Sequence, residues 1–83
     1  MNHDIEDLKA AEKKVVGAKQ TLKSIEKGEA RAVFIADDAE DKVIAPLIKL
    51  CEEKGISWRY AGSMAELGRA SEIKVGAAAV AIV

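Results

Sequence analysis

Apolar and polar positions along the 83-residue chain follow two periods, one typical of helices and one typical of buried strands. Residues 18–27 repeat their apolar positions at helical spacing, which predicts an amphipathic helix that Gly28 ends. The inner stripe of this helix consists of Ala18, Thr21, Leu22 and Ile25. Residues 32–36 are instead apolar at every position, as in a strand buried on both faces.

The same reading of the whole chain predicts helices and strands in alternation. Pro46 suits the first turn of a helix, so the third helix is placed at 46–54 with a preceding turn at 42–45. Ser63 and Glu66 have the spacing of a capping box. The predicted helices are 4–13, 18–27, 46–54 and 63–71, and the predicted strands are 15–16, 32–36, 56–60 and 77–83. This alternation predicts an α/β fold, a three-layer α/β/α sandwich.

Length and composition limit the chain to one small domain, residues 1–83. Hydrophobic residues make up 49% of the chain and the net charge is −1, values typical of a globular domain. The longest uncharged apolar run is 75–83, far short of the roughly 20 residues that span a bilayer. The single cysteine excludes an internal disulfide, so we expect a cytoplasmic protein with no membrane partner.

The residue inventory argues against an enzyme. One histidine and one cysteine are too few for a zinc site of Cys and His ligands. A Ser-His-Asp set would need His3 at the chain terminus, and no glycine-rich phosphate loop is present. We therefore expect no catalytic residue, no metal and no cofactor.

Charge is distributed unevenly along the chain. Residues 13–31 carry six basic and two acidic side chains, whereas residues 32–53 carry two basic and six acidic ones. Segment charge matters more than net charge for local anion binding. The segment 13–31 is therefore the candidate for contact with a polyanion.

Basic side chains cluster on the helix that follows Gly17. Lys19, Gln20, Lys23 and Lys27 fall within about 100° of one another, opposite the apolar stripe. Stacked lysines repel by roughly 0.2–0.5 kcal/mol per pair. A phosphate backbone would relieve this repulsion and could also use the free N–H groups of the helix N-terminus. The alternative is an ordinary solvated lysine face.

A second candidate feature is the loop of Ile73, Lys74, Val75 and Gly76 before the last strand. It places two β-branched apolar residues in a turn, where exposure to water is unfavourable. These side chains could form an apolar platform for an unstacked base. Alternatively, they close the edge of the core.

Three other features favour structural roles. The acidic loop 37–41 could bind Mg²⁺, but helix capping is the usual role of such residues. Cys51 has the position of a small buried residue on a helix. Trp58 and Tyr60 share one strand face, which is typical of a core or its edge, and too few aromatics exist for a base-stacking sheet.

Five blocks, in order, resemble the kink-turn-binding large-subunit ribosomal protein family, which includes the archaeal protein shared by ribosomes and box C/D particles. The similarity covers nearly the whole chain from Lys13 and looks closest to the short bacterial branch, which lacks the final archaeal helix. The blocks are 16–28, 33–39, 50–56, 67–70 and 78–82.

The resemblance implies a four-stranded mixed sheet and binding to kink-turns, which are RNA duplexes sharply bent at a bulge followed by sheared G·A pairs. The family's base-reading positions fall on Lys19, Gln20 and Lys23. Lys23 matches the family pattern. Lys19 and Gln20 depart from the archaeal Asn-Glu pair but look like the bacterial version, and Gln20 keeps an acceptor oxygen.

The resemblance also implies a place for the extruded bulge base. The family's loop that packs on this base falls on residues 73–76, and the carboxylate and apolar residue that help to hold it fall on Glu40 and Ile44. Glu72 stands where the family usually has glycine.

Taken together, these observations predict a monomeric, non-catalytic RNA-binding protein, with ribosomal RNA or a riboswitch-like leader as its partner. The alternative is a protein–protein adaptor of the same fold, which the slightly acidic net charge favours. A small hydrolase is a distant third, because no nucleophile–base set exists.

Overall fold

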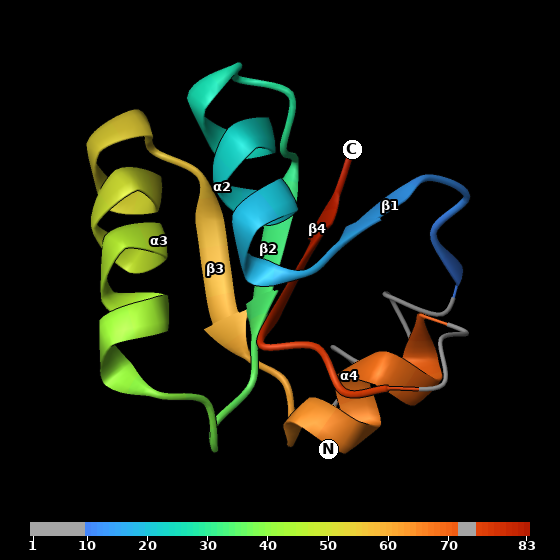
Figure 1. Ribbon diagram of the computed structural model, residues 1–83. Helices are drawn as coiled ribbons and strands as arrows, with labels where there is room; N and C mark the ends of the chain where they lie inside the picture. The colour runs from blue at the N-terminus through green and yellow to red at the C-terminus, as the bar shows by residue number, and fades with distance from the viewer. Residues whose placement is uncertain (1–9, 72–74) are drawn as a thin grey trace.

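A four-stranded mixed sheet runs through the middle of the computed structural model, which describes residues 10–71 and 75–83 (Figure 1). The strand order is β1-β4-β2-β3; β4 is antiparallel to β1 and β2, and β3 is parallel to β2. The strands are β1 (Lys14–Val16), β2 (Ala32–Ile35), β3 (Ser57–Tyr60) and β4 (Ala79–Ile82), and the helices are α2 (Ala18–Glu26), α3 (Asp41–Lys54) and α4 (Met64–Ala70). The predicted α/β fold is confirmed.

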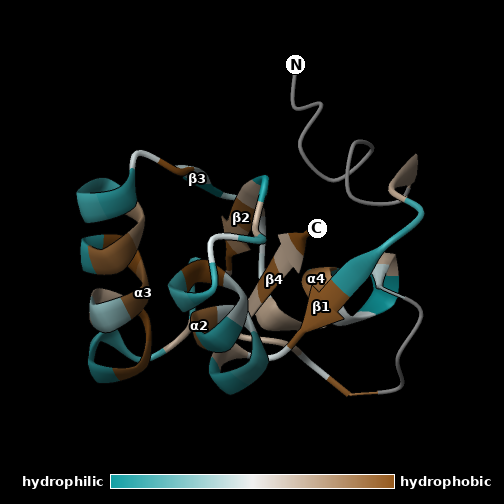
Figure 2. Ribbon diagram, turned by 90° about the horizontal axis from the view of Figure 1, so that it is seen from above, coloured by the Kyte–Doolittle hydropathy of each residue, from teal (hydrophilic) through white to brown (hydrophobic). Residues whose placement is uncertain are grey.

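Alternating side chains of β2 divide the core into two layers. Val33 and Ile35 point towards α2 and α3, whereas Phe34 points towards α4. Because successive strand residues face opposite sides of a sheet, an apolar run can fill both layers. Figure 2 shows the central strands in brown with the helices around them.

Both ends of α2 are set by glycines that adopt positive φ. Gly17 precedes the helix at φ 102°, and Gly28 follows it at φ 73°. Between them, the apolar side of the helix packs into the core, where Ile25 is fully buried. The predicted helix over 18–27 is one residue shorter in the structure.

The predicted start of α3 at residue 46 is wrong, because the helix begins at Asp41 and contains Pro46. Proline removes the hydrogen bond that its own N–H would give to the carbonyl of residue 42, and its ring crowds that carbonyl. Pro46 lies on the exposed side, where water can hydrate that carbonyl. The helix ends as predicted at Gly55, which adopts the left-handed conformation.

The capping box at the start of α4 is confirmed. The hydroxyl of Ser63 accepts from the N–H of Glu66, and the Glu66 carboxylate accepts from the N–H of Ser63, both at 3.1 Å. On the edge strand β3, the rings of Trp58 and Tyr60 meet edge to face with centroids 5.5 Å apart.

The apolar pattern of the sequence predicts a core of ten residues, namely Leu22, Ile25, Phe34, Ile35, Leu47, Leu50, Cys51, Leu67, Val80 and Ile82. Seven of the ten are buried, and Leu22, Leu50 and Ile82 are only partly buried. The seven are Ile25, Phe34, Ile35, Leu47, Cys51, Leu67 and Val80. The predicted helix 4–13 falls mostly on residues 1–9, outside the described residues, as does His3; in its described part Ala10 is helical and residues 11–13 are not, so the predicted end at residue 13 is wrong. Among the described residues, no helix has the length and apolar character that a bilayer crossing requires.

Candidate functional site

Three segments that are far apart in the chain meet at one end of the sheet. The N–H of Gly17, before α2, donates to the carbonyl of Ala79 at 2.9 Å. The N–H of Ala36, after β2, donates to the carbonyl of Ala78 at 2.9 Å. The N-terminus of α2, the β2–α3 loop and the start of β4 are therefore neighbours, and each carries residues singled out from the sequence.

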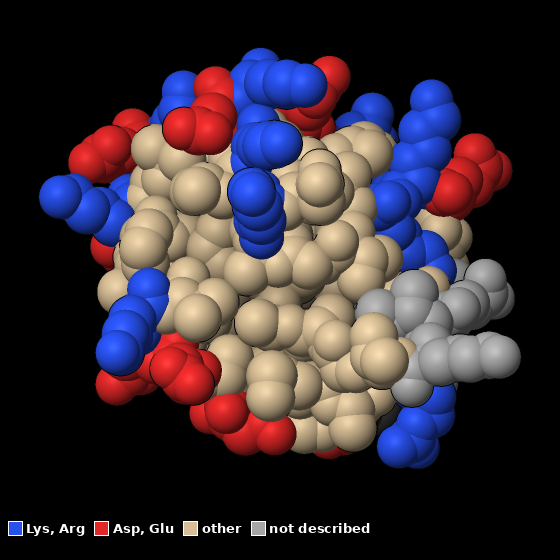
Figure 3. All heavy atoms as spheres, viewed as in Figure 1, with Lys and Arg blue, Asp and Glu red and all other residues tan. Residues whose placement is uncertain are grey.

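The predicted basic side of α2 faces solvent. Lys19, Gln20, Lys23 and Lys27 are all exposed, while Thr21 beneath them is fully buried. Figure 3 shows blue side chains along α2, with a less charged surface below them at its N-terminal end. We call these four exposed side chains the basic face of α2.

The N-terminus of α2 is open to an anion. Gly17 supplies no side-chain cap, and the first turn of α2 contains no acidic residue. The first hydrogen bond within the helix joins the N–H of Thr21 to the carbonyl of Gly17. The N–H groups of the first turn therefore add a positive dipole end to the nearby lysines.

The β2–α3 loop and the first turn of α3 carry two predicted site residues, one exposed and one buried. Glu40 is exposed and immediately precedes α3, close to the N-terminus of that helix. Ile44, which the family resemblance places beside a bound base, is 4% exposed and belongs to the core between α3 and the sheet. Ile44 therefore packs in the core beneath the first turn of α3 and offers almost no surface to a ligand.

Asp38 has a structural role in the same loop, in agreement with the capping interpretation of the acidic segment. Its Oδ1 accepts a 2.8 Å hydrogen bond from the N–H of Met64 at the start of α4. Among residues 10–71 and 75–83, no group of three or more His, Cys, Asp or Glu is placed to hold a metal ion.

The loop before β4 presents Val75 to solvent. Its side chain is 72% exposed, the most exposed of the large hydrophobic residues described, and Gly76 beside it is exposed too. Val75 therefore does not close the edge of the core. Ile73, Lys74 and Glu72 lie outside the described residues.

Met64 is a surface residue at this end that sequence patterns did not point out. It is 37% exposed and lies against Gly76, because a Cβ at Gly76 would come within 3.1 Å of the Met64 Cβ. Methionine at the first position of a helix carries no local indication of its neighbours, so only the fold could place it beside Val75.

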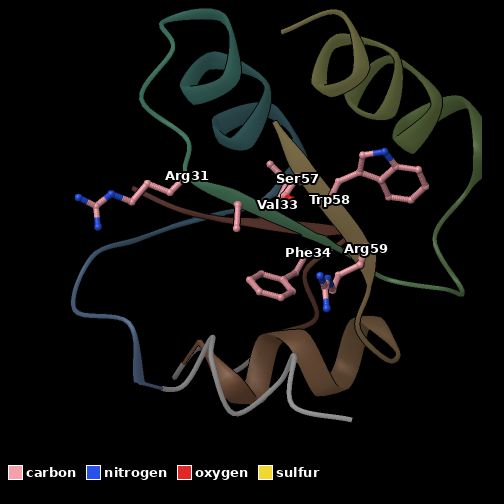
Figure 4. Close-up of a pocket in the computed structure, with 7 residues that line it drawn as sticks. Arg31, Val33, Phe34, Ser57, Trp58 and Arg59 are labelled. Carbon is pink, nitrogen blue, oxygen red and sulfur yellow. The ribbon is translucent and has the colours of Figure 1, made fainter. Parts of the chain in front are cut away.

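A separate hollow of about 280 Å³ lies over β2 and β3 (Figure 4). Phe34 and Arg59 point to the α4 side of the sheet there, and Trp58 points to the other side. None of the predicted site residues that the structure describes lines this hollow. It therefore does not belong to the candidate site.

Cys51 behaves as the predicted small apolar core residue. Its side chain is fully buried, and burial raises the pKa of the thiol, with a further contribution from the carboxylate of Glu52. A thiol kept protonated in this way is a poor nucleophile.

Comparison with known proteins identifies the family. The model of the Ribosomal protein L7Ae/L30e/S12e/Gadd45 family matches residues 1–83. The chain belongs to this family. It is a family of ribosomal and RNA-binding proteins and not a class of enzymes, which confirms the resemblance and the non-catalytic assignment.

Bacterial members of similar length are among its relatives. The chain is 51% identical over 69 residues to an RNA-binding protein of Caldanaerobacter subterraneus subsp. tengcongensis, which covers 83% of this chain and 84% of the relative. It is 42% identical over 72 residues to the RNA-binding protein YbxF of Geobacillus stearothermophilus, covering 87% and 88% of the two chains.

Solved structures show the same fold. The Giardia lamblia 15.5kD RNA binding protein superposes with a TM-score of 0.82 and 30% identity, covering 94% of this chain and 66% of that one. The chain thus spans about two thirds of the length of the Giardia protein. A Bacillus halodurans protein of unknown function, at 20% identity and TM-score 0.80, supports the fold alone.

Proposed function

We propose that this protein binds structured RNA and recognises kink-turns, with the basic face of α2 on the phosphates and base edges. The observation that carries this proposal is the meeting of three segments at one end of the sheet. That end carries the uncapped N-terminus of α2 with its exposed lysines, and it also carries the start of β4, which follows the loop of the exposed Val75. Relatives named as RNA-binding proteins support the same class of ligand.

The basic face of α2 suits a phosphate backbone. Lysines bind phosphate as mobile point charges, and the N–H groups of the first turn bind it directionally. In our proposal Lys19 and Lys23 contact phosphates or guanine acceptors, and Gln20 uses its amide to read a base edge. Lys27, one turn further along, extends the electrostatic contact.

The apolar loop suits an extruded base. Unstacked bases in RNA are recognised by apolar and aromatic surfaces, and Val75 offers such a surface. Glu40, exposed on the neighbouring loop, can accept a hydrogen bond from a base N–H. In this proposal Ile73, Lys74 and Gly76 complete the loop, and Ile44 supports Glu40 from the core.

The protein is expected to act as a monomer, because a kink-turn presents one bulge and one set of G·A pairs. By binding only the bent form, it would shift the RNA equilibrium by the difference in its affinity for the two forms.

The decisive experiment is kink-turn folding followed by energy transfer between dyes on the two RNA arms, without added Mg²⁺. We expect the protein to raise transfer for a kink-turn RNA and not for an RNA whose G·A pairs are replaced by Watson–Crick pairs. An adaptor without RNA binding would change neither signal. A protein that bound both RNAs equally at moderate salt would contradict kink-turn recognition while leaving RNA binding in place.

A further inference from the structure

Through the backbone of Met64, helix α4 makes one hydrogen bond to each of the two loops at the candidate site. The N–H of Met64 donates to Asp38 Oδ1 in the β2–α3 loop at 2.8 Å. The carbonyl oxygen of the same residue accepts from the N–H of Ala77, after Val75 and Gly76, at 3.0 Å. A single residue thus connects two loops that are far apart in the sequence.

Close packing reinforces the second of these contacts. A Cβ at Gly68 would collide with the carbonyl oxygen of Val75, and a Cβ at Gly76 would meet Met64 atoms at 3.1–3.2 Å. The backbone of residues 75–76 therefore lies directly on α4, and Ala77 beyond it is 3% exposed. Contact with α4 therefore positions the backbone that carries the exposed Val75 side chain.

We propose that Asp38 is a positioning residue for RNA recognition, which acts through Met64 on the loop that carries Val75. This inference rests on the proposed function, because it assigns the discrimination between kink-turn and plain duplex to the relative placement of Glu40 and Val75. Met64, itself 37% exposed beside Gly76, extends the apolar surface offered to an extruded base.

The chain offers a charge-matched set of variants for a test. Asp38→Ala removes the acceptor, while Asp38→Asn keeps an acceptor oxygen at the same place with the same change of charge. Glu66→Ala also removes one negative charge and one hydrogen bond from the start of α4, that to the N–H of Ser63. In contrast to Asp38, Glu66 makes no described hydrogen bond to either loop.

The first measurement is hydrogen exchange of the free protein at the Ala77 amide. Loss of one hydrogen bond is expected to speed exchange in Asp38→Ala about fivefold relative to wild type. Asp38→Asn and Glu66→Ala should stay close to wild type. Equal exchange in Asp38→Ala and Glu66→Ala would overturn the coupling, whatever the protein does with RNA.

The second measurement is the ratio of affinities for a kink-turn RNA and for its Watson–Crick-substituted duplex. We expect this ratio to fall about fivefold in Asp38→Ala and to be kept in Asp38→Asn and Glu66→Ala. A ratio unchanged in Asp38→Ala would refute the positioning role. If wild-type protein itself shows no preference, the proposed function fails, and the exchange result still decides whether Asp38 controls the loop.

Discussion

The carbonyl oxygen of Gly17 accepts from the N–H of Thr21 while the N–H of Gly17 donates to the carbonyl of Ala79, each at 2.9 Å. One glycine thus joins the first turn of α2 to the first residue of β4. Its φ of 102° and ψ of 147° lie in a region that is essentially restricted to glycine. The basic face of α2 is therefore oriented by a residue that no side chain can replace without strain.

We predict that Gly17→Ala lowers the free energy of unfolding by about 1–3 kcal/mol. The cause is backbone strain, because no atom beyond the neighbouring residues in the chain lies within 4 Å of the added Cβ. Urea unfolding would measure the change. Gly28→Asn is the matched control, since its φ of 73° is a conformation that asparagine tolerates. Equal losses in the two variants would contradict the strain argument.

Two leucines on α3 differ in burial, so their replacement by alanine should cost different amounts of stability. Leu47 is 1% exposed, whereas Leu50 is only partly buried and packs against the cluster that contains Leu47. Leu47→Ala should lower the free energy of unfolding by about 2–5 kcal/mol through the cavity it leaves, and Leu50→Ala should cost less. Denaturant titration of both variants would check the order, and a larger loss at Leu50 would be inconsistent with this packing.

Because the Cys51 thiol is buried, we predict that the free energy of unfolding decreases at alkaline pH. Burial raises the pKa of its thiol in the folded state, and Glu52 adds to the effect. Stability from the buried neutral thiol is fully present below the unfolded pKa of about 8.5. Above it the unfolded chain loses the proton first, so stability falls as the pH rises through the folded pKa. Wild type should lose more stability than Cys51→Ala between pH 7 and pH 10, and parallel curves would exclude this linkage.

The order of helices and strands could be predicted from the sequence because it depends on local periodicity and on capping residues. The start of α3 could not, since the preference of proline for a first turn points to residue 46, whereas the helix begins at Asp41 and accommodates Pro46 on its exposed side. Ile44 shares the inner face of α3 with Leu47 and Cys51 at helical spacing, so the helical period, correctly extended, places it in the core.

For the candidate site, the basic face of α2 was predictable because its residues lie on one helix. The contacts around Met64 were not, because Asp38 and Met64 are 26 residues apart and meet only through the fold. A carboxylate accepting from a distant backbone N–H has no sequence pattern of its own. The residues that contact RNA in our proposal were therefore easier to find than the residues that hold them in place.

Salt dependence should measure the contribution of the basic face. If Lys19, Lys23 and a few neighbours neutralise phosphates, the logarithm of affinity should fall with that of salt at roughly 0.7–0.9 per contact, a slope near −3. Lys19→Gln and Lys23→Gln should each reduce the slope by about one contact. Lys49→Gln on the exposed side of α3 is the control and should leave it unchanged. A flat salt response of the wild type would show that this face does not carry binding.

The last prediction separates recognition of an extruded base from general attraction to phosphate. Phosphate contacts carry no sequence information, so lysines alone would favour any duplex. In our proposal Val75, 72% exposed before β4, contacts the base that only a kink-turn extrudes. Val75→Asp should therefore weaken kink-turn binding far more than binding to the Watson–Crick-substituted duplex.

Val43→Asp is the control for the effect of the added charge. It introduces one carboxylate at another exposed valine, near the start of α3. Charge repulsion alone would weaken both RNAs by a similar factor in both variants, because Coulomb forces on a polyanion do not distinguish a bulge. Contact with the base would instead lower the kink-turn to duplex ratio only in Val75→Asp, by about tenfold if one stacked base is lost. Equal ratios in the two variants would mean that Val75 does not touch the base, even if the protein binds RNA.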